Sequence, residues 1–351
     1  MTLLSRIKHL GPAVLALLGT VSCDSLIFDT GEDCSVKYRL KFRYDMNLKF
    51  ADAFAREVES VSLYAFDQTG KLVWQGSERG EALTAADYSM QLDLEPGNYR
   101  LVAWCGLDGR DSFSLPDAAS ASRPDDLHCR LNCVSAATDG RTLPTRSDKD
   151  LSPLFHGMMD VELPDNDNGE EYVYEMSLTK DTNVFHIILQ HLSGEELNAA
   201  DFEFSIEDCN SWLAYDNFLL RDEPVVYCPW AVYSSASGAG SSRAAVMPKA
   251  IVAELTVNRL LVQDWTKYQR PTLVIRSADG GDIVASASII DYALLVKSEY
   301  NKQMDDQEYL DRADEYTMTF FLDNNNQWVR ALIEIGVLSW EVVRNDSDLN
   351  G

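Results

Sequence analysis

The sequence around Cys23 predicts a thiol that is acylated and then becomes the first residue of the mature chain. Arg6 and Lys8 give a basic start, and the apolar run PAVLALLGTV follows at residues 12–21. That run is too short to cross a bilayer but has the length of a signal-peptide core. The small residues of TVSC, which ends at Cys23, form a lipobox-like site. Thr20 stands where leucine is usual, so an ordinary secretory signal with a nearby cysteine is the alternative.

A lipid on this cysteine would hold the protein at a membrane, because each buried methylene contributes about 0.8 kcal/mol. We therefore expect residues 1–22 to be a lipoprotein signal peptide. Residues 23–33 would then be a lipidated tether, and the chain that follows would face water.

The other six cysteines are even in number, which in an exported protein is typical of disulfides. They are Cys34, Cys105, Cys129, Cys133, Cys209 and Cys228. Cys209 and Cys228 are far from the others in sequence, and we expect them to pair. Of the three pairings open to the first four, we favour Cys34 with Cys105 and Cys129 with Cys133.

A metal site at His128, Cys129 and Cys133 is the weaker interpretation of the same residues. No second ligand pair follows at zinc spacing, and thiols in an oxidising compartment favour disulfides. We expect no metal and no cofactor.

The sequence lacks the motifs of the common catalytic sites. It has no Gly-x-Ser-x-Gly elbow, His-Glu-x-x-His helix, Walker loop or Gly-x-Gly-x-x-Gly turn opening a helix. His186 and His191 flank an apolar strand pattern, where a capping role is commoner than a general base. We expect no enzymatic activity and no small-molecule substrate.

The tryptophans offer either a platform for stacking sugars or core packing. Most of them lie on strand patterns, which favours packing. They are Trp74, Trp104, Trp212, Trp230, Trp265, Trp328 and Trp340.

Charge and composition exclude two classes of partner. The formal net charge is −26, and loss of Arg6 and Lys8 with the signal peptide makes the mature chain more acidic. Nucleic acid and anionic lipid head groups would repel such a chain. With 46% hydrophobic residues it is nevertheless a folded body rather than a disordered acidic tail.

Alternation of apolar and polar residues is the main local pattern, and it predicts many half-buried strands. In the first half these are expected at 36–44, 58–66, 71–75, 88–94, 99–104, 158–163 and 172–178. In the second half they are expected at 184–190, 202–206, 250–257, 272–275, 283–289, 316–322 and 329–343. Residues 305–315 form the one good helical window after the signal peptide. The chain is therefore predicted to be all-β, with domains at 34–181 and 182–351 that are each a β-sandwich.

Several segments together resemble the fimbrial anchor lipoproteins of Bacteroidales, the base subunits of type V pili. The resemblance extends from the lipobox nearly to the C-terminus, and its specificity comes from the order of the motifs. They are CDSLIFD at 23–29, DCSV at 33–36, YRLKFRYDMN at 38–47, ADAF at 51–54, PGNY at 96–99, AWCG at 103–106, WLAYDN at 212–217, QEYLDR at 307–312 and YTMTFFL at 316–322.

The resemblance implies two tandem transthyretin-like β-sandwiches that assemble with stalk pilin subunits by strand exchange. It also implies a lipid anchor in the outer membrane at the base of the fimbrium, and a subunit that ends the polymer there. Such an anchor would keep its first strand, whereas stalk subunits lose theirs to an arginine-specific protease. Arg39 and Arg43 would then lie uncut on the outer face of that strand.

The last strand pattern is the candidate donor to the stalk. Ala331, Ile333, Ile335 and Val337 form one apolar row that could enter a groove of the partner, or the segment could simply be the last strand of the second sandwich. Two other functions stay open at this point. One is a surface glycan-binding lipoprotein that uses the tryptophans, and the other is a tip adhesin with a proteolysed N-terminus.

Overall fold

The computed structural model describes residues 37–107, 112–133, 137–138, 141–142, 145–165, 170–221, 223–236, 249–297 and 301–335. The signal peptide, Cys23, the tether, Cys34 and Val337 lie outside the described residues. The fold is all-β, as the alternating pattern predicts. No helix in the described part is long and apolar enough to cross a membrane.

The first part of the chain forms one seven-stranded sheet in the order β3-β2-β5-β11-β12-β1-β4, which we call the first region. Its strands are β1 (Lys37–Met46), β2 (Ser60–Asp67), β3 (Leu72–Arg79), β4 (Met90–Leu92), β5 (Gly97–Cys105), β11 (Phe155–Leu163) and β12 (Glu171–Lys180). The strands expected in this part are confirmed, with ends that shift by a few residues.

Alternation along β1 explains its place in the sheet. Tyr38, Leu40, Phe42 and Tyr44 are at most 2% exposed and contribute to the core of the first region. The lysines and arginines between them lie on the other face. A strand with one apolar row is stabilised when that row is covered by other side chains. The alternating pattern therefore determines which face of β1 is turned toward the core.

The second part of the chain builds two five-stranded sheets, which we call the second region. One has the order β10-β17-β14-β20-β21, and the other has the order β18-β19-β13-β22-β23. Their strands are β10 (Thr145–Ser147), β13 (Thr182–His191), β14 (Phe202–Asp208), β17 (Val225–Tyr227), β18 (Ala231–Ala236), β19 (Lys249–Asn258), β20 (Thr272–Ser277), β21 (Ile283–Ser288), β22 (Glu315–Leu322) and β23 (Trp328–Ile335). Apolar rows of both sheets contribute to one large core.

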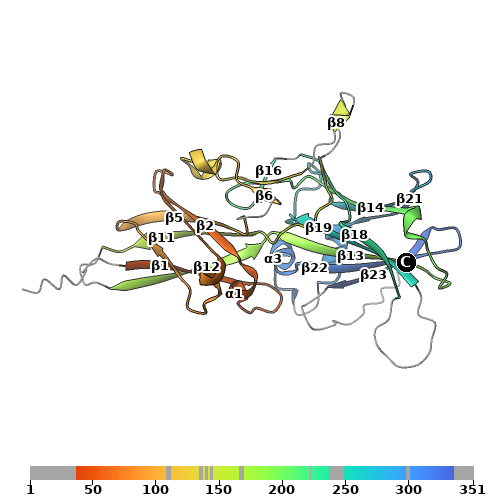
Figure 1. The fold of residues 1–351 in the computed structure, drawn as a ribbon, viewed down its shortest axis with the longest axis horizontal. Helices are drawn as coiled ribbons and strands as arrows, with labels where there is room; N and C mark the ends of the chain where they lie inside the picture. The colour runs from red at the N-terminus through yellow and green to blue at the C-terminus, as the bar shows by residue number, and fades with distance from the viewer. Residues whose placement is uncertain are drawn as a thin grey trace, which may run out of the picture.

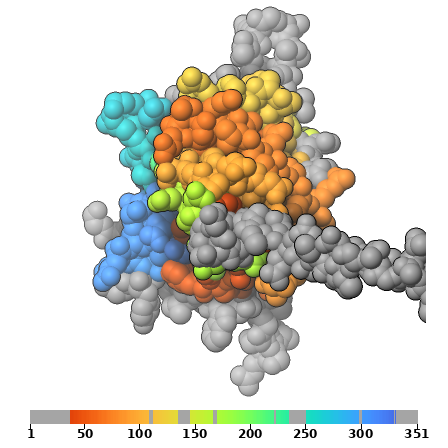
Figure 2. All heavy atoms as spheres, turned by 90° about the vertical axis from the view of Figure 1, so that its left-hand side faces the viewer, coloured from red at the N-terminus to blue at the C-terminus, as the bar shows by residue number. Residues whose placement is uncertain are grey.

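The described part of residues 106–154, called the insertion, joins the two regions. Its β10 pairs with β17, and β7 (Cys129–Leu131) pairs with β15 (Trp212–Leu213). The remaining short strands of the insertion are β6 (Phe113–Ser114), β8 (Ala137–Thr138) and β9 (Arg141–Thr142), and β16 (Leu219–Arg221) pairs with β15. Sequence analysis placed the insertion in the first domain, whereas β10 pairs with β17 of the second region and β7 pairs with β15, which lies between β14 and β17 in the chain. The insertion also lies along one side of the first region in both views, where the Leu72 N–H donates to the Ser122 carbonyl oxygen (Figures 1 and 2).

The sheets change between β12 and β13, where Asp181 alone separates two ten-residue strands. In Figure 1, β12 leads directly into β13 along the length of the molecule. This change coincides with the domain boundary expected after residue 181. The division into two transthyretin-like domains stays a prediction.

Helices are few and short in the part of the chain that the structure describes. They are α1 (Phe54–Glu57), α2 (Ile289–Leu295) and α3 (Asp306–Arg312), with 3-10 turns at Gly80–Thr84, Ala118–Ser120, Pro124–Asp126 and Ala199–Asp201. The helical window at 305–315 is confirmed by α3, which begins after the cap Asp305. α2 was missed, although the Ser288 side chain accepts a hydrogen bond from the Asp291 N–H as an N-cap does.

Candidate tether and assembly sites

The first strand is paired on both sides within its own sheet. β1 runs parallel to β12 in register from Lys37 opposite Glu171 to Arg43 opposite Ser177. On its other side it runs antiparallel to β4, where Leu40 lies opposite Met90. The place between β12 and β4 is therefore occupied by a strand of the same chain, and no strand of another subunit is needed to fill it.

The two arginines of β1 are held by neighbouring strands and loops. The Arg39 guanidinium donates to the hydroxyl and the carbonyl oxygen of Ser89, at 2.7 Å each. Arg43 lies 3.2 Å from Glu175 and 3.5 Å from Asp45. A protease binds several residues around the cleaved bond in an extended form. While β1 stays paired with β12 and β4, its backbone is not accessible for such binding.

The candidate donor strand lies in β23, at one margin of the second region. Its backbone runs antiparallel to β22, with Ala331 opposite Phe320, Ile333 opposite Met318 and Ile335 opposite Tyr316. Phe320, Met318 and Tyr316 are all at most 1% exposed.

Among the described strands, β22 is the only partner of β23. Its second backbone edge has no strand partner within the described residues, and such an edge is the kind of surface to which another strand can add. Within the described residues the segment is the last strand of its own sheet, and its role as a donor to the stalk stays a prediction.

The predicted pairing of Cys209 with Cys228 is wrong, because Cys228 is a free thiol. The register of β14 and β17 pairs Ile206 with Tyr227. Cys209 lies three residues beyond that pair toward one end of the ladder, and Cys228 one residue beyond it toward the other. The two residues are thus separated by about 13 Å along the strands, which is more than a disulfide spans.

The predicted Cys129–Cys133 disulfide is also not formed, since both are free thiols. Cys129 lies in β7, so the chain leaves it in an extended direction that carries Cys133 away. Burial raises the pKa of the Cys133 thiol to about 11. Cys105 is a buried free thiol as well, and Cys34, its predicted partner, lies outside the described residues.

A buried polar cluster, which we call the junction cluster, lies where β12 becomes β13. Arg259 binds Asp311 through two hydrogen bonds of 2.8 and 2.7 Å, and it also donates to the Asn217 carbonyl oxygen. The Asn217 amide donates to Asp181 at 2.8 Å. Arg259 is 3.8 Å from the same Asp181 oxygen.

Asp181 is the most constrained member of this cluster. It is fully buried, and its second carboxylate oxygen has no hydrogen-bond partner among the described residues. Burial raises the pKa of Asp181 to about 7, and the nearby Arg259 charge limits the rise. Sequence analysis placed only a domain boundary after Asp181, because Arg259 and Asp311 are distant in sequence and only the fold brings them there.

A second set of contacts, which we call the latch, ties the end of β1 to the second region. Lys180 lies 3.2 Å from Glu57 and 2.8 Å from Asp314. The Arg312 guanidinium donates to the Asp45 carbonyl oxygen at 3.0 Å. The Arg312 carbonyl in turn accepts a hydrogen bond from the N–H of Leu48.

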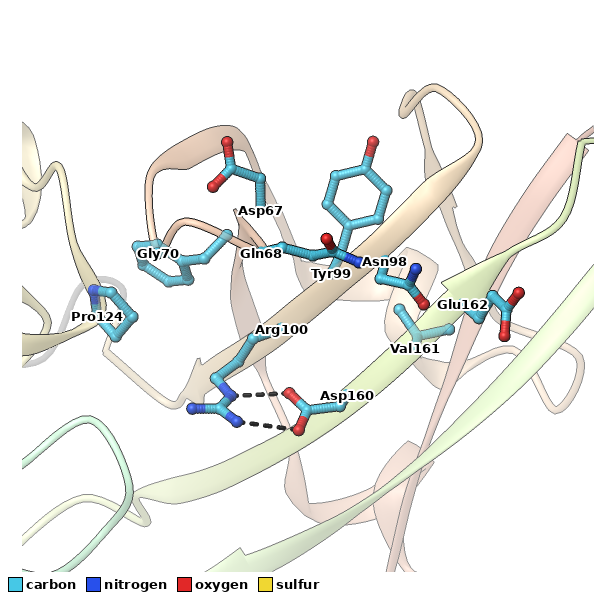
Figure 3. A pocket seen from close by; sticks show the side chains of 11 residues that line it. Asp67, Gln68, Gly70, Asn98, Tyr99, Arg100, Pro124, Asp160, Val161 and Glu162 are labelled. Atoms are coloured by element: carbon cyan, nitrogen blue, oxygen red, sulfur yellow. Dashed lines mark hydrogen bonds and ion pairs between the residues drawn. The ribbon is translucent and has the colours of Figure 1, made fainter.

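A cavity of about 410 Å³ opens beside the β2–β3 turn of the first region. Arg100 and Asp160 face each other in it through hydrogen bonds of 2.8 and 2.9 Å, with Tyr99, Gln68 and Glu162 around them (Figure 3). The Arg100–Asp160 pair satisfies its own charges, so the cavity presents no uncompensated charge from that pair to a ligand.

The tryptophans do not form a platform in the described residues. Trp104 is fully buried, whereas Trp230 is 37% exposed. Trp74 packs against the core of the first region, and Trp265 and Trp328 pack against the core of the second. The described residues also contain no cluster of three histidine, cysteine or carboxylate side chains that could hold a metal ion.

These features define an all-β protein of joined sheets, with a first strand held in its own sheet and a last strand at a margin. A family model described as Mfa2, fimbrillin-A associated anchor proteins Mfa1 and Mfa2, matches residues 30–346. The chain belongs to this family of fimbrial anchor proteins, which confirms the resemblance found in the sequence.

A curated relative is the minor fimbrium anchoring subunit Mfa2 of Porphyromonas gingivalis, which is 24% identical over 222 residues. That match covers 62% of this chain and 64% of the relative, so the chain spans less than two thirds of the relative's length.

Solved structures are similar over most of the chain. A candidate adhesin from Bacteroides thetaiotaomicron has a TM-score of 0.74 and 33% identity, covering 88% of this chain and 97% of its own. The fimbrial anchor protein Mfa2 from Porphyromonas gingivalis has a TM-score of 0.61 and 15% identity, covering 88% of this chain and 99% of its own. At 15% identity, the similarity to the Mfa2 structure shows that the two chains share a fold.

Proposed function

We propose that this chain is the base subunit of a fimbrium, anchored in the outer membrane by a lipid on Cys23. It joins the terminal stalk pilin by strand exchange and stops further growth of the polymer at the membrane. The observation that carries this proposal is the pairing of β1, which is held by β12 and β4 within its own sheet. With that position filled, a strand from another subunit cannot take the place between β12 and β4 in the first region.

The open edge of β23 supports the other half of the proposal. A strand added there would pair its backbone with a sheet that already contains β13 and β22. The fimbrium would then attach to the second region, and the membrane to the chain before β1. The two attachments would lie at opposite ends of the described fold.

Replacement of Cys23 by serine tests the lipid anchor. Cys23→Ser should move the protein from the membrane fraction to the medium, with intact fimbriae shed along with it. Cys228→Ser is the matched control, because it removes a partly exposed thiol elsewhere and should leave both in the membrane fraction. A Cys23→Ser protein that stays membrane-bound with its fimbriae attached would contradict the anchor.

The edge of β23 is tested by a pull-down through a tag on the second region. The proposal predicts that a ladder of stalk pilin co-purifies with the wild type. Thr319→Pro, within β22, is unsuitable because it breaks the sheet itself. Val329→Pro is preferable, because Val329 lies near the start of β23 at a register irregularity, where it has no partner residue on β22. Co-purification of pilin at the wild-type level with the folded variant would count against pairing along β23.

A further inference from the structure

The ladder between β1 and β12 lies directly on the path between the N-terminal end of the described chain and the second region. β1 begins at Lys37, and eight register pairs join it to β12. β12 continues through Asp181 into β13, the central strand of a five-stranded sheet in the second region. On this shortest path the residues are joined by peptide bonds everywhere except between β1 and β12, which are joined by backbone hydrogen bonds.

The direction of the two strands decides how that step bears a load. In a parallel pair, one strand is pulled at its N-terminal end while the other is pulled at its C-terminal end. The load therefore runs along the strands, across hydrogen bonds that are evenly spaced and all stressed together. A pull at the same end of both strands would instead open the bonds one at a time.

Side chains reinforce the ladder on both faces. Leu40 and Phe42 on the inner face are 0% and 1% exposed. On the outer face, Arg43 bridges to Glu175 at 3.2 Å, and the Ser177 hydroxyl donates to Asp45 at 3.0 Å. Sliding β1 along β12 would break these contacts together with the backbone bonds.

The latch adds a second connection at the far end of β1. Arg312 and Lys180 tie the Asp45 carbonyl and Glu57 to the turn before β22. The segment between β1 and β12, which contains most of the first region, lies outside the loaded path while the ladder holds.

We propose that the parallel β1–β12 ladder is a mechanical clamp that carries tension between the tether and the second region. It shields residues 47–170 from that tension. The physiological load rests on the proposed function, in which the membrane holds the N-terminal end and the fimbrium pulls on the second region. The clamp itself is a property of the purified protein.

Single-molecule pulling on the purified, unlipidated full chain tests the clamp in two geometries. In the shear geometry, one handle is placed before Lys37 and the other in a ligation tag inserted after Glu195, beyond the end of β13. In the peeling geometry, the second tag follows Asp165, which is exposed and lies just before β12. Circular dichroism confirms that each tagged protein is folded.

The clamp predicts a clearly higher rupture force in the shear geometry than in the peeling geometry at the same loading rate. After the shear rupture, the first region should unravel and release about 50 nm of chain, at roughly 3.5 Å per residue. Equal rupture forces in the two geometries would overturn the proposal. A first rupture that releases much less chain would overturn it as well, since it would place the weakest link elsewhere.

A pair of matched variants tests whether the outer-face contacts belong to the clamp. Arg43→Gln removes an ion pair that crosses from β1 to β12, and it should raise the rupture rate under shear several-fold. Arg100→Gln removes an ion pair of similar exposure between β5 and β11, inside the shielded segment, and should leave the first rupture unchanged. Equal effects of the two variants would contradict the assignment.

These outcomes are independent of the membrane and of any pilin. A clamp without anchoring would show strong shear resistance in a protein whose Cys23→Ser variant stays with the membrane. An anchor without a clamp would show equal rupture forces in the two geometries, in a protein whose Cys23→Ser variant leaves the membrane fraction.

Discussion

At the scale of single residues, the junction cluster is the part of the molecule that the sequence could not reveal. Asp181 looks like a polar linker residue between two strands, yet it is fully buried beside Arg259. Burial of a charge is costly unless partners replace water, and here the partners come from loops far along the chain. Only the fold shows that a boundary residue is also a core residue.

The pKa of Asp181 gives a prediction with a definite sign. Its folded-state pKa, about 7, lies above its ordinary value of 3.8, so between these values the folded protein keeps a proton that the unfolded chain has lost. This residue's contribution to the free energy of unfolding therefore falls as pH rises through that window. Asp181→Asn cannot titrate, so its stability relative to the wild type should increase from pH 4 to pH 7.

Urea unfolding of both proteins at several pH values measures this difference. Asp165→Asn is the control for the chemical change itself, because it makes the same replacement at an exposed carboxylate. A relative stability of Asp181→Asn that is constant or falls with pH would show that Asp181 is ionised in the folded protein.

At the scale of elements, the long strands could be predicted and the short ones could not. Polar and apolar residues alternate along the ten residues of β1, from Lys37 to Met46. The period of two and the buried row can therefore be predicted from the sequence. β6 and β15 have two residues each, which is too few to show any period. The expected disulfides failed for a related reason, because strand register decides which cysteines meet and spacing in sequence does not.

The buried row of β1 predicts the cost of weakening that strand. Leu40 is 0% exposed, and Leu40→Ala should lower the free energy of unfolding by about 2–5 kcal/mol. Lys41→Ala, one residue along on the opposite face, should change it by about 0.5 kcal/mol or less. Urea unfolding measures both values.

The same pair of variants tests the protection of Arg39 and Arg43. An arginine-specific protease should leave the wild type and Lys41→Ala uncut in β1 and should cut Leu40→Ala faster. Equal cleavage of all three proteins would mean that pairing of β1 does not shield its arginines.

At the scale of the whole molecule, contacts between the regions join what sequence analysis treated as separate domains. The latch places Lys180 between Glu57 of the first region and Asp314 of the second, with each of the three side chains at most 23% exposed. The insertion adds β10, which pairs with β17 of the second region, and β7, which pairs with β15.

A double-mutant cycle measures the latch. Lys180→Met and Asp314→Ala should show a coupling energy of about 1–3 kcal/mol, because partly buried charges lose their partner. The exposed pair Lys267 and Asp264 serves as the control and should couple by less than about 1 kcal/mol. Similar coupling in the two pairs would indicate that the latch is an ordinary surface ion pair.

The mature N-terminus of protein taken from cells tests the central claim most directly, since a base subunit must keep both its tether and β1. Mass spectrometry should find a chain that begins at Cys23, carries lipid on that residue and continues intact through Arg39 and Arg43. A chain that begins after Arg39 or Arg43 would contradict the account and identify a stalk or tip subunit instead.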